Sequence, residues 1–174
     1  AIPKVGVARD GQPEDRKIEH HVPETILSIV KTENLQAPDF PRGFQIEVKN
    51  VSTKPIYFMR FQVVLPLIKG HVGTAQDYAY PISYGNTRLS NFGVQPSETD
   101  KPVMPGESVT LVTTEKLAEG VHNFLTHNAL SKEENLSQVL LRCNLVSFSD
   151  GSGYTGVGNN SITRVSLFDS RKND

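Results

Sequence analysis

The stretch that decides the fold reads Phe44-Gln-Ile-Glu-Val-Lys-Asn-Val-Ser-Thr-Lys-Pro-Ile-Tyr-Phe-Met-Arg-Phe-Gln-Val-Val-Leu65. Its first part alternates apolar residues with polar ones, and a period of two places the apolar set on the buried face of a β-strand. Its last part, continued to residue 67, predicts a long strand whose inward face consists of Tyr57, Met59, Phe61, Val63, Leu65 and Leu67. The turn at residues 50–55 predicts that these two strands form a hairpin or cross between two sheets.

Similar short apolar runs, separated by turn residues, occur along the rest of the chain. In the run at residues 139–149, the alternation assigns Leu141, Cys143 and Leu145 to one face. Strands are predicted at residues 25–30, 44–48, 57–67, 78–83, 88–92, 109–111, 139–149 and 162–167. The fold class that follows is all-β, mainly β with one short helix.

That helix is predicted at residues 115–128. Four apolar residues recur there at helical spacing, namely Leu117, Val121, Phe124 and Leu125. The hydroxyl of Thr113 or Thr114 is placed to cap the helix by accepting a hydrogen bond from its first turn.

Composition excludes several classes of function. The 174 residues suit one domain, and 18 Lys+Arg against 19 Asp+Glu leave a formal net charge of −1. A near-neutral chain has no electrostatic reason to bind nucleic acid or acidic membranes. The longest apolar run, at 63–68, is far too short for a transmembrane segment. The single cysteine, Cys143, excludes an intrachain disulfide.

The N-terminal residues 1–22 lack periodicity and are interpreted as an extended arm, with the domain proper at residues 23–174. Ile2, Val5 and Val7 make the start of the arm mildly apolar. One interpretation is a solvated terminus, and the other is a strand that adds to the sheet edge of another chain. The first residue, Ala1, fits a mature exported protein, although a trimmed chain would look the same.

Three segments resemble bacterial immunoglobulin-like and fibronectin-like β-sandwich domains of uncharacterised secreted proteins. They are residues 44–56, where a strand ends in Val-x-Asn and resumes at Pro-Ile, the Pro-Gly-Glu turn and strand at 105–111, and residues 145–154. The resemblance spans about residues 25–157 and implies an immunoglobulin-like antiparallel β-sandwich located outside the cytoplasm. These motifs specify turns, so they inform on fold more than on function.

Two loop motifs suggest ligands, each beside a plainer interpretation. Asp150, Ser152 and Asn159 could offer oxygens to calcium, although the same side chains could simply hydrogen-bond their own turn. Residues 151–156 match G-x-G-x-x-G, but no helix start follows, so a glycine-rich hairpin loop is the better interpretation.

The loop-rich middle of the chain gathers three tyrosines and Phe92. Tyr78, Tyr80 and Tyr84 could stack on sugars or anchor a partner if they are exposed. They could equally cover a small satellite core under long loops.

These observations lead to a hypothesis of function. We expect a non-catalytic extracellular or periplasmic interaction or assembly module, for example a fibre or surface-layer subunit that uses its N-terminal arm for strand addition. Self-association or another surface protein would be its partner. The alternative is a carbohydrate- or calcium-binding module. We expect no enzyme activity, no catalytic residues, and no cofactor unless calcium binds.

Overall fold

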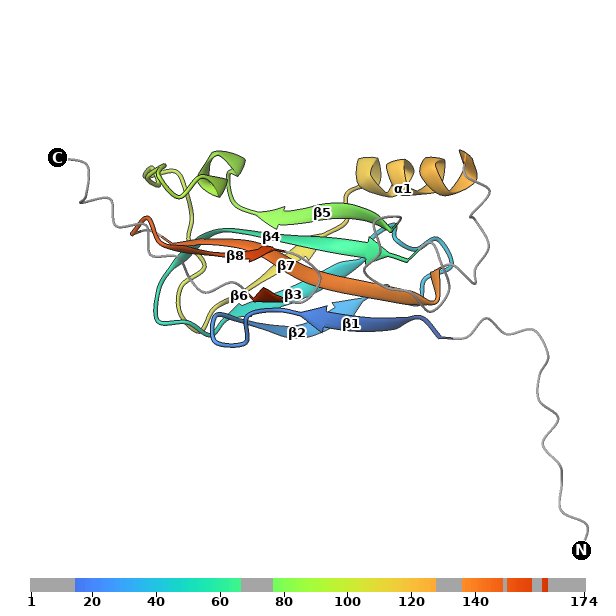
Figure 1. The fold of residues 1–174 in the computed structure, drawn as a ribbon, viewed down its shortest axis with the longest axis horizontal. Helices are drawn as coiled ribbons and strands as arrows, with labels where there is room; N and C mark the ends of the chain where they lie inside the picture. The colour runs from blue at the N-terminus through green and yellow to red at the C-terminus, as the bar shows by residue number, and fades with distance from the viewer. Residues whose placement is uncertain (1–14, 67–76, 128–135, 149, 158–160, 163–174) are drawn as a thin grey trace, which may run out of the picture.

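The computed structural model describes residues 15–66, 77–127, 136–148, 150–157 and 161–162, which form two β-sheets (Figure 1). The six-stranded sheet has the order β5-β4-β7-β8-β9, and β1 also pairs with β7. Its strands are β1 Lys17–His21, β4 Ile56–Leu65, β5 Tyr78–Tyr84, β7 Gln138–Phe148, β8 Gly153–Val157 and β9 Ser161–Ile162. The three-stranded sheet has the order β2-β3-β6, with β2 Leu27–Glu33, β3 Gln45–Asn50 and β6 Ser108–Val112.

One hydrophobic core lies between the two sheets. From the three-stranded sheet it takes Ile46, Val48 and Leu111, and from the six-stranded sheet Met59, Phe61, Val63, Leu141, Cys143 and Val146. These side chains are at most 3% exposed, so alternate residues of both sheets face inward. The prediction of an all-β fold with one helix is confirmed, and its layers form a β-sandwich.

The bulge in β4 changes the direction in which the Tyr57 side chain points. Ile56 pairs with Phe148 of β7 and Phe58 pairs with Ser147, so Tyr57 is an extra residue on the β4 side. A bulge of this kind re-aims the side chain at the extra position. Ile56 and Met59 therefore belong to the core, whereas Tyr57 is half-buried outside it. The prediction that Tyr57 faces inward is wrong for this reason.

A second bulge corrects the predicted face of β7. Arg60 pairs with Leu145 and Phe61 pairs with Cys143, which leaves Asn144 as the extra residue of β7. The core set therefore passes from Cys143 to Val146, and Leu145 is only half-buried. Strict alternation across residues 139–149 fails because one inserted residue shifts every later side chain to the opposite face.

The helix prediction is confirmed by α1, Glu115–His127, which lies beside β5 in Figure 1. Thr114 caps it, since its Oγ1 accepts a hydrogen bond from the Leu117 amide at 3.4 Å. Val121 and Leu125 are buried, and the Phe124 ring stacks near Tyr78 of β5 at 4.4 Å between centroids.

The strand predicted at residues 88–92 is wrong. A short 3-10 helix, η1, occupies Thr87–Ser90 instead. Its formation follows from Asn86, whose side chain accepts a hydrogen bond from the Arg88 amide while its carbonyl accepts one from Leu89. Local capping of this kind competes with strand pairing.

Part of the segment interpreted as an arm belongs to the domain. Residues 17–21 form β1, which pairs in parallel with residues 138–142 of β7, while β8 pairs with residues 145–147 on the same side of β7. Arg16 fastens the start of β1: its Nε donates to the Leu136 carbonyl at 2.9 Å, and its guanidinium lies 4.5 Å from the centroid of the Phe40 ring. Ile2, Val5 and Val7 lie outside the described residues.

Candidate functional site

Among the described strands, β3 alone pairs with β6, so the other edge of β6 is open to pairing with an added strand. Thr113 donates its amide to the Phe44 carbonyl and Asn50 donates to the Glu107 carbonyl, which fixes the odd-numbered residues of β6 as the ones bonded to β3. The amide and carbonyl groups of Ser108, Thr110 and Val112 therefore point away from β3. All three residues are exposed, Val112 by 45%.

Three other edges in the described part of the chain, at β5, β2 and β1, carry features that discourage pairing. On β5, Pro81 lies in the middle of the strand, where it can donate no hydrogen bond to an added strand. On β2, the register shifts at Val30, and the charged Lys31 and Glu33 follow. On β1, four of the five residues are charged or histidine. Strand β6, with the sequence Ser-Val-Thr-Leu-Val, has no proline, charge or bulge.

A separate hollow, which we call the loop pocket, lies where the bulge of β4 meets the loop after β5. It has a volume of about 340 Å³, and its lining residues are Tyr57, Tyr84, Gly85, Asn86, Thr99, Asp100 and Lys101. Gly85 adopts φ +90°, and a Cβ there would lie 2.1 Å from the Tyr57 carbonyl oxygen. Only glycine permits this close approach of the loop to β4.

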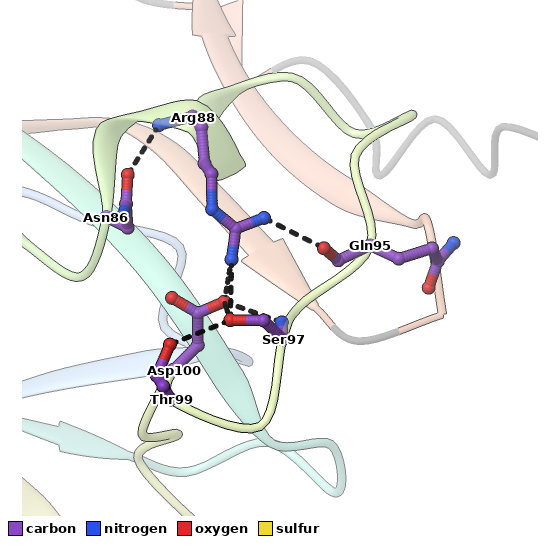
Figure 2. Close-up of polar contacts among 6 residues, drawn as sticks. All are labelled: Asn86, Arg88, Gln95, Ser97, Thr99 and Asp100. Atoms are coloured by element: carbon purple, nitrogen blue, oxygen red, sulfur yellow. Dashed lines mark hydrogen bonds and ion pairs between the residues drawn. The ribbon is translucent and has the colours of Figure 1, made fainter.

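The loop that forms the far wall of the pocket is held by one ion pair (Figure 2). The Arg88 guanidinium contacts Oδ2 of Asp100 and also donates to the Gln95 carbonyl at 2.9 Å. Oδ2 of Asp100 further accepts from the Ser97 amide at 2.7 Å and from its hydroxyl at 3.0 Å. The hydrogen bond from the Ser97 backbone is the main cause that lowers the pKa of Asp100 below its usual value, so this carboxylate stays ionised.

Comparison with known proteins finds no matching family model, no matching curated protein and no matching solved structure.

The structure separates the three tyrosines that were predicted as a group. Only Tyr84 lines the loop pocket, where its hydroxyl donates to the Lys101 carbonyl at 2.7 Å. Tyr80 is buried in the core, and Tyr78 packs against α1. Tyr57 lines the pocket with Tyr84 instead. The sequence analysis missed Tyr57 because no local signal marks the bulge that turns it outward.

Phe92, which was grouped with the tyrosines, lies on the turn between β7 and β8. A Cβ on Gly153 would come within 2.1 Å of its ring. The G-x-G-x-x-G sequence leads into β8, which pairs antiparallel with β7, so it forms a hairpin rather than a nucleotide loop. Its glycine at 153 gives room for the Phe92 ring.

Two of the three residues proposed for calcium, Asp150 and Ser152, are hydrogen-bonded to each other, and Asp150 also pairs with a cation. Oδ1 of Asp150 accepts from the Ser152 amide at 3.0 Å, and Lys54 Nζ lies 2.6 Å from Oδ2. Asn159 lies outside the described residues. Within those residues no group of three or more His, Cys, Asp and Glu side chains is placed to hold a metal ion. The calcium site stays a prediction.

The pair formed by Lys54 and Ser152 resembles a nucleophile with its base, because Nζ lies 3.1 Å from Oγ. However, Ser152 is only 2% exposed, and the Lys54 ammonium is ion-paired with Asp150. An ammonium held by a carboxylate is a poor base, and a buried hydroxyl offers no access to a substrate. The pair therefore supports the turn rather than catalysis.

A transmembrane segment was not expected from the sequence. Across the described residues, no helix has the length and apolar character needed to cross a membrane.

Proposed function

We propose that this chain is a non-catalytic interaction and assembly module that accepts an extended strand at the β6 edge. Added strands gain affinity from main-chain hydrogen bonds, and their side chains supply specificity. The single observation that carries the proposal is the contrast between β6 and the edges at β5, β2 and β1. Those three have proline, a bulge or charges, which are the features that proteins use to prevent unwanted pairing.

The donor strand in this proposal is the N-terminal arm of a second copy. Ile2, Val5 and Val7 provide apolar side chains in that segment. Because Arg16 and β1 are fixed to the domain, the donor must lie before residue 15. The outward β6 groups at Ser108, Thr110 and Val112 supply three amides and three carbonyls to such a strand.

The strand order also supports an immunoglobulin-like class for the sandwich. In immunoglobulin domains, a sheet built on the central strands C and F faces a sheet built on strands A, B and E. The strands β5-β4-β7-β8 correspond to the first of these sheets, and β2-β3-β6 correspond to the second. Parallel β1 and the helix between β6 and β7 depart from that pattern. Together with the family resemblance, this class supports our proposal that the module acts in the extracellular or periplasmic space.

The test is the mass of the full-length chain in solution, measured by light scattering over a range of concentrations. We expect assemblies larger than one chain. Thr110→Pro should raise the dissociation constant at least tenfold, about 1.4 kcal/mol, because it removes an outward amide and leaves the β3 hydrogen bonds intact. Removal of residues 1–14 should have the same effect.

Two further variants make the result specific. Ser83→Pro is the matched control, since Ser83 has the same orientation as Pro81 on β5, an edge that proline already blocks. It should leave the assembly unchanged. Thr110→Lys places a charge on the β6 edge without constraining the backbone and should weaken assembly even if the proline variant folds poorly. A wild-type chain that stays monomeric at every concentration overturns the proposal, as does assembly that persists in both Thr110 variants.

A further inference from the structure

The loop pocket has no part in strand addition at β6, and its chemistry points to a ligand of its own. We infer that it binds one pyranose unit of a neutral carbohydrate, with Tyr57 and Tyr84 as the aromatic contacts and Asp100 and Lys101 as polar contacts. A volume of about 340 Å³ lies at the lower end of the range of about 300–1,000 Å³ that is usual for small-molecule pockets.

The aromatic side of the pocket comes from two different strands. Tyr57 is turned outward by the β4 bulge, and Tyr84 is the last residue of β5. Both tyrosines are half-buried residues of the pocket lining, and a tyrosine side chain combines an apolar ring face with a polar hydroxyl. The axial C–H groups of a sugar ring match such faces, while its hydroxyl groups lie at the ring edge.

The polar side offers both hydrogen-bond acceptors and donors. Figure 2 shows the second carboxylate oxygen of Asp100 pointing away from Arg88 and Ser97, and no hydrogen bond engages it in the described part of the chain. The Asp100 side chain is only 8% exposed and is held by Arg88, so this oxygen is preorganised. Asn86 uses its side-chain oxygen to cap η1, which leaves its NH₂ group to donate.

The charges of the pocket favour a neutral ligand. Asp100 and Arg88 neutralise each other, and Lys101 is the remaining charged residue of the lining. A phosphate or sulfate would require a cluster of free cations, and among the described residues that line the pocket Lys101 is the one cation without an ion pair. Neighbouring sugar hydroxyls can donate to a carboxylate and accept from an ammonium or amide, which is the combination present here.

The experiment is a titration of the full chain with cellotetraose, maltotetraose, chitotetraose and mannotriose. Saturation-transfer NMR and calorimetry measure the binding of each sugar. We expect at least one of these probes to bind. Tyr57→Leu and Lys101→Ala should each weaken that binding at least tenfold. Tyr78→Phe is the matched control, because this tyrosine packs on α1 away from the pocket and should leave binding unchanged.

The Lys101 side chain is exposed, and it is the backbone carbonyl of this residue that accepts the hydrogen bond from Tyr84. Lys101→Ala keeps that carbonyl, so the variant should fold like the wild type. Absence of binding by all four probes overturns the inference. So does binding that survives both pocket variants, because the sugar would then occupy another surface. Light scattering of the same variants should give the wild-type mass, which keeps the outcome independent of assembly at β6.

Discussion

Tyr80 and Thr113 join the two sheets through a single buried hydrogen bond. The Tyr80 hydroxyl, on β5, lies 3.0 Å from Oγ1 of Thr113, which directly follows β6, and both side chains are only 2% exposed. Burial raises the pKa of Tyr80 above its ordinary value, so the phenol stays neutral and can keep this bond. The contact therefore fixes the position of β5, and with it Tyr84, relative to β6.

The Tyr80→Phe variant should be less stable than the wild type by about 1–3 kcal/mol, because the Thr113 hydroxyl is left buried without a partner. Urea unfolding followed by circular dichroism measures the difference. The double variant Tyr80→Phe/Thr113→Val removes both polar groups and should cost less than the two single changes added together. Strictly additive costs would show that the two hydroxyls do not interact.

Cys143 should be chemically inert in the folded chain. It is 1% exposed, and burial raises the pKa of its thiol to about 12, so almost no thiolate forms at pH 8. We expect a thiol reagent such as DTNB to modify it only after unfolding in guanidinium chloride, when one equivalent should react. Rapid modification of the native chain would contradict the buried placement of β7.

The ion pair of Lys54 with Asp150 should give stability that depends on pH. Burial acts to raise the pKa of Asp150, but the hydrogen bonds from Lys54 and Ser152 outweigh it and lower this pKa from 3.8 to about 2. A carboxyl with a lowered pKa stabilises the folded state above pH 3.8, and this contribution is lost as the pH falls towards 2.

Lys54→Met should therefore reduce stability near pH 6 by about 1 kcal/mol or less, since the two side chains are 39% and 48% exposed. Urea titrations of both proteins from pH 6 down to pH 2 test this. The gap between wild type and variant should close below pH 3.8. Lys54 Nζ also lies 5.4 Å from the centroid of the Phe148 ring. A gap that stays constant over this range would assign the effect to this contact instead of the ion pair with Asp150.

Arg16 should control how firmly β1 is held. Its backbone exchanges hydrogen bonds of 2.7 Å with the Gln36 side chain, and its guanidinium reaches the Leu35 carbonyl and the Phe40 ring. Arg16→Met should speed amide hydrogen exchange in β1 at least tenfold. Protection in β4 should not change. Equal losses of protection in β1 and β4 would mean that β1 does not open separately.

The sequence predicted where helices and strands lie better than it predicted which of their side chains face the core. The apolar spacing, with a cap at Thr113 or Thr114, was sufficient to predict α1, because helix signals are local. Tyr57 and Leu145 were assigned to the wrong face, since each lies at or beside an extra residue created by pairing between β4 and β7. A bulge depends on the partner strand, which is distant in sequence, and strict alternation contains no sign of it.

The residues of the candidate sites also divide into those that the sequence indicated and those that only the structure identified. Tyr84 was identified from its loop-rich surroundings, whereas Tyr57 and Asp100 were not, because their role depends on the approach of the loop to β4. The open edge at β6 could not be predicted either, since an edge is defined by the strands that do not pair with it.

The amino-acid sequence by itself determined the all-β class, most strand positions and the helix, because periodicity acts within a few residues. Only the tertiary structure decided the strand order, the two bulges, the capture of β1 by Arg16, the open edge at β6 and the loop pocket. Each of these arises from hydrogen bonds or packing between segments far apart in the chain, where local preference has no influence.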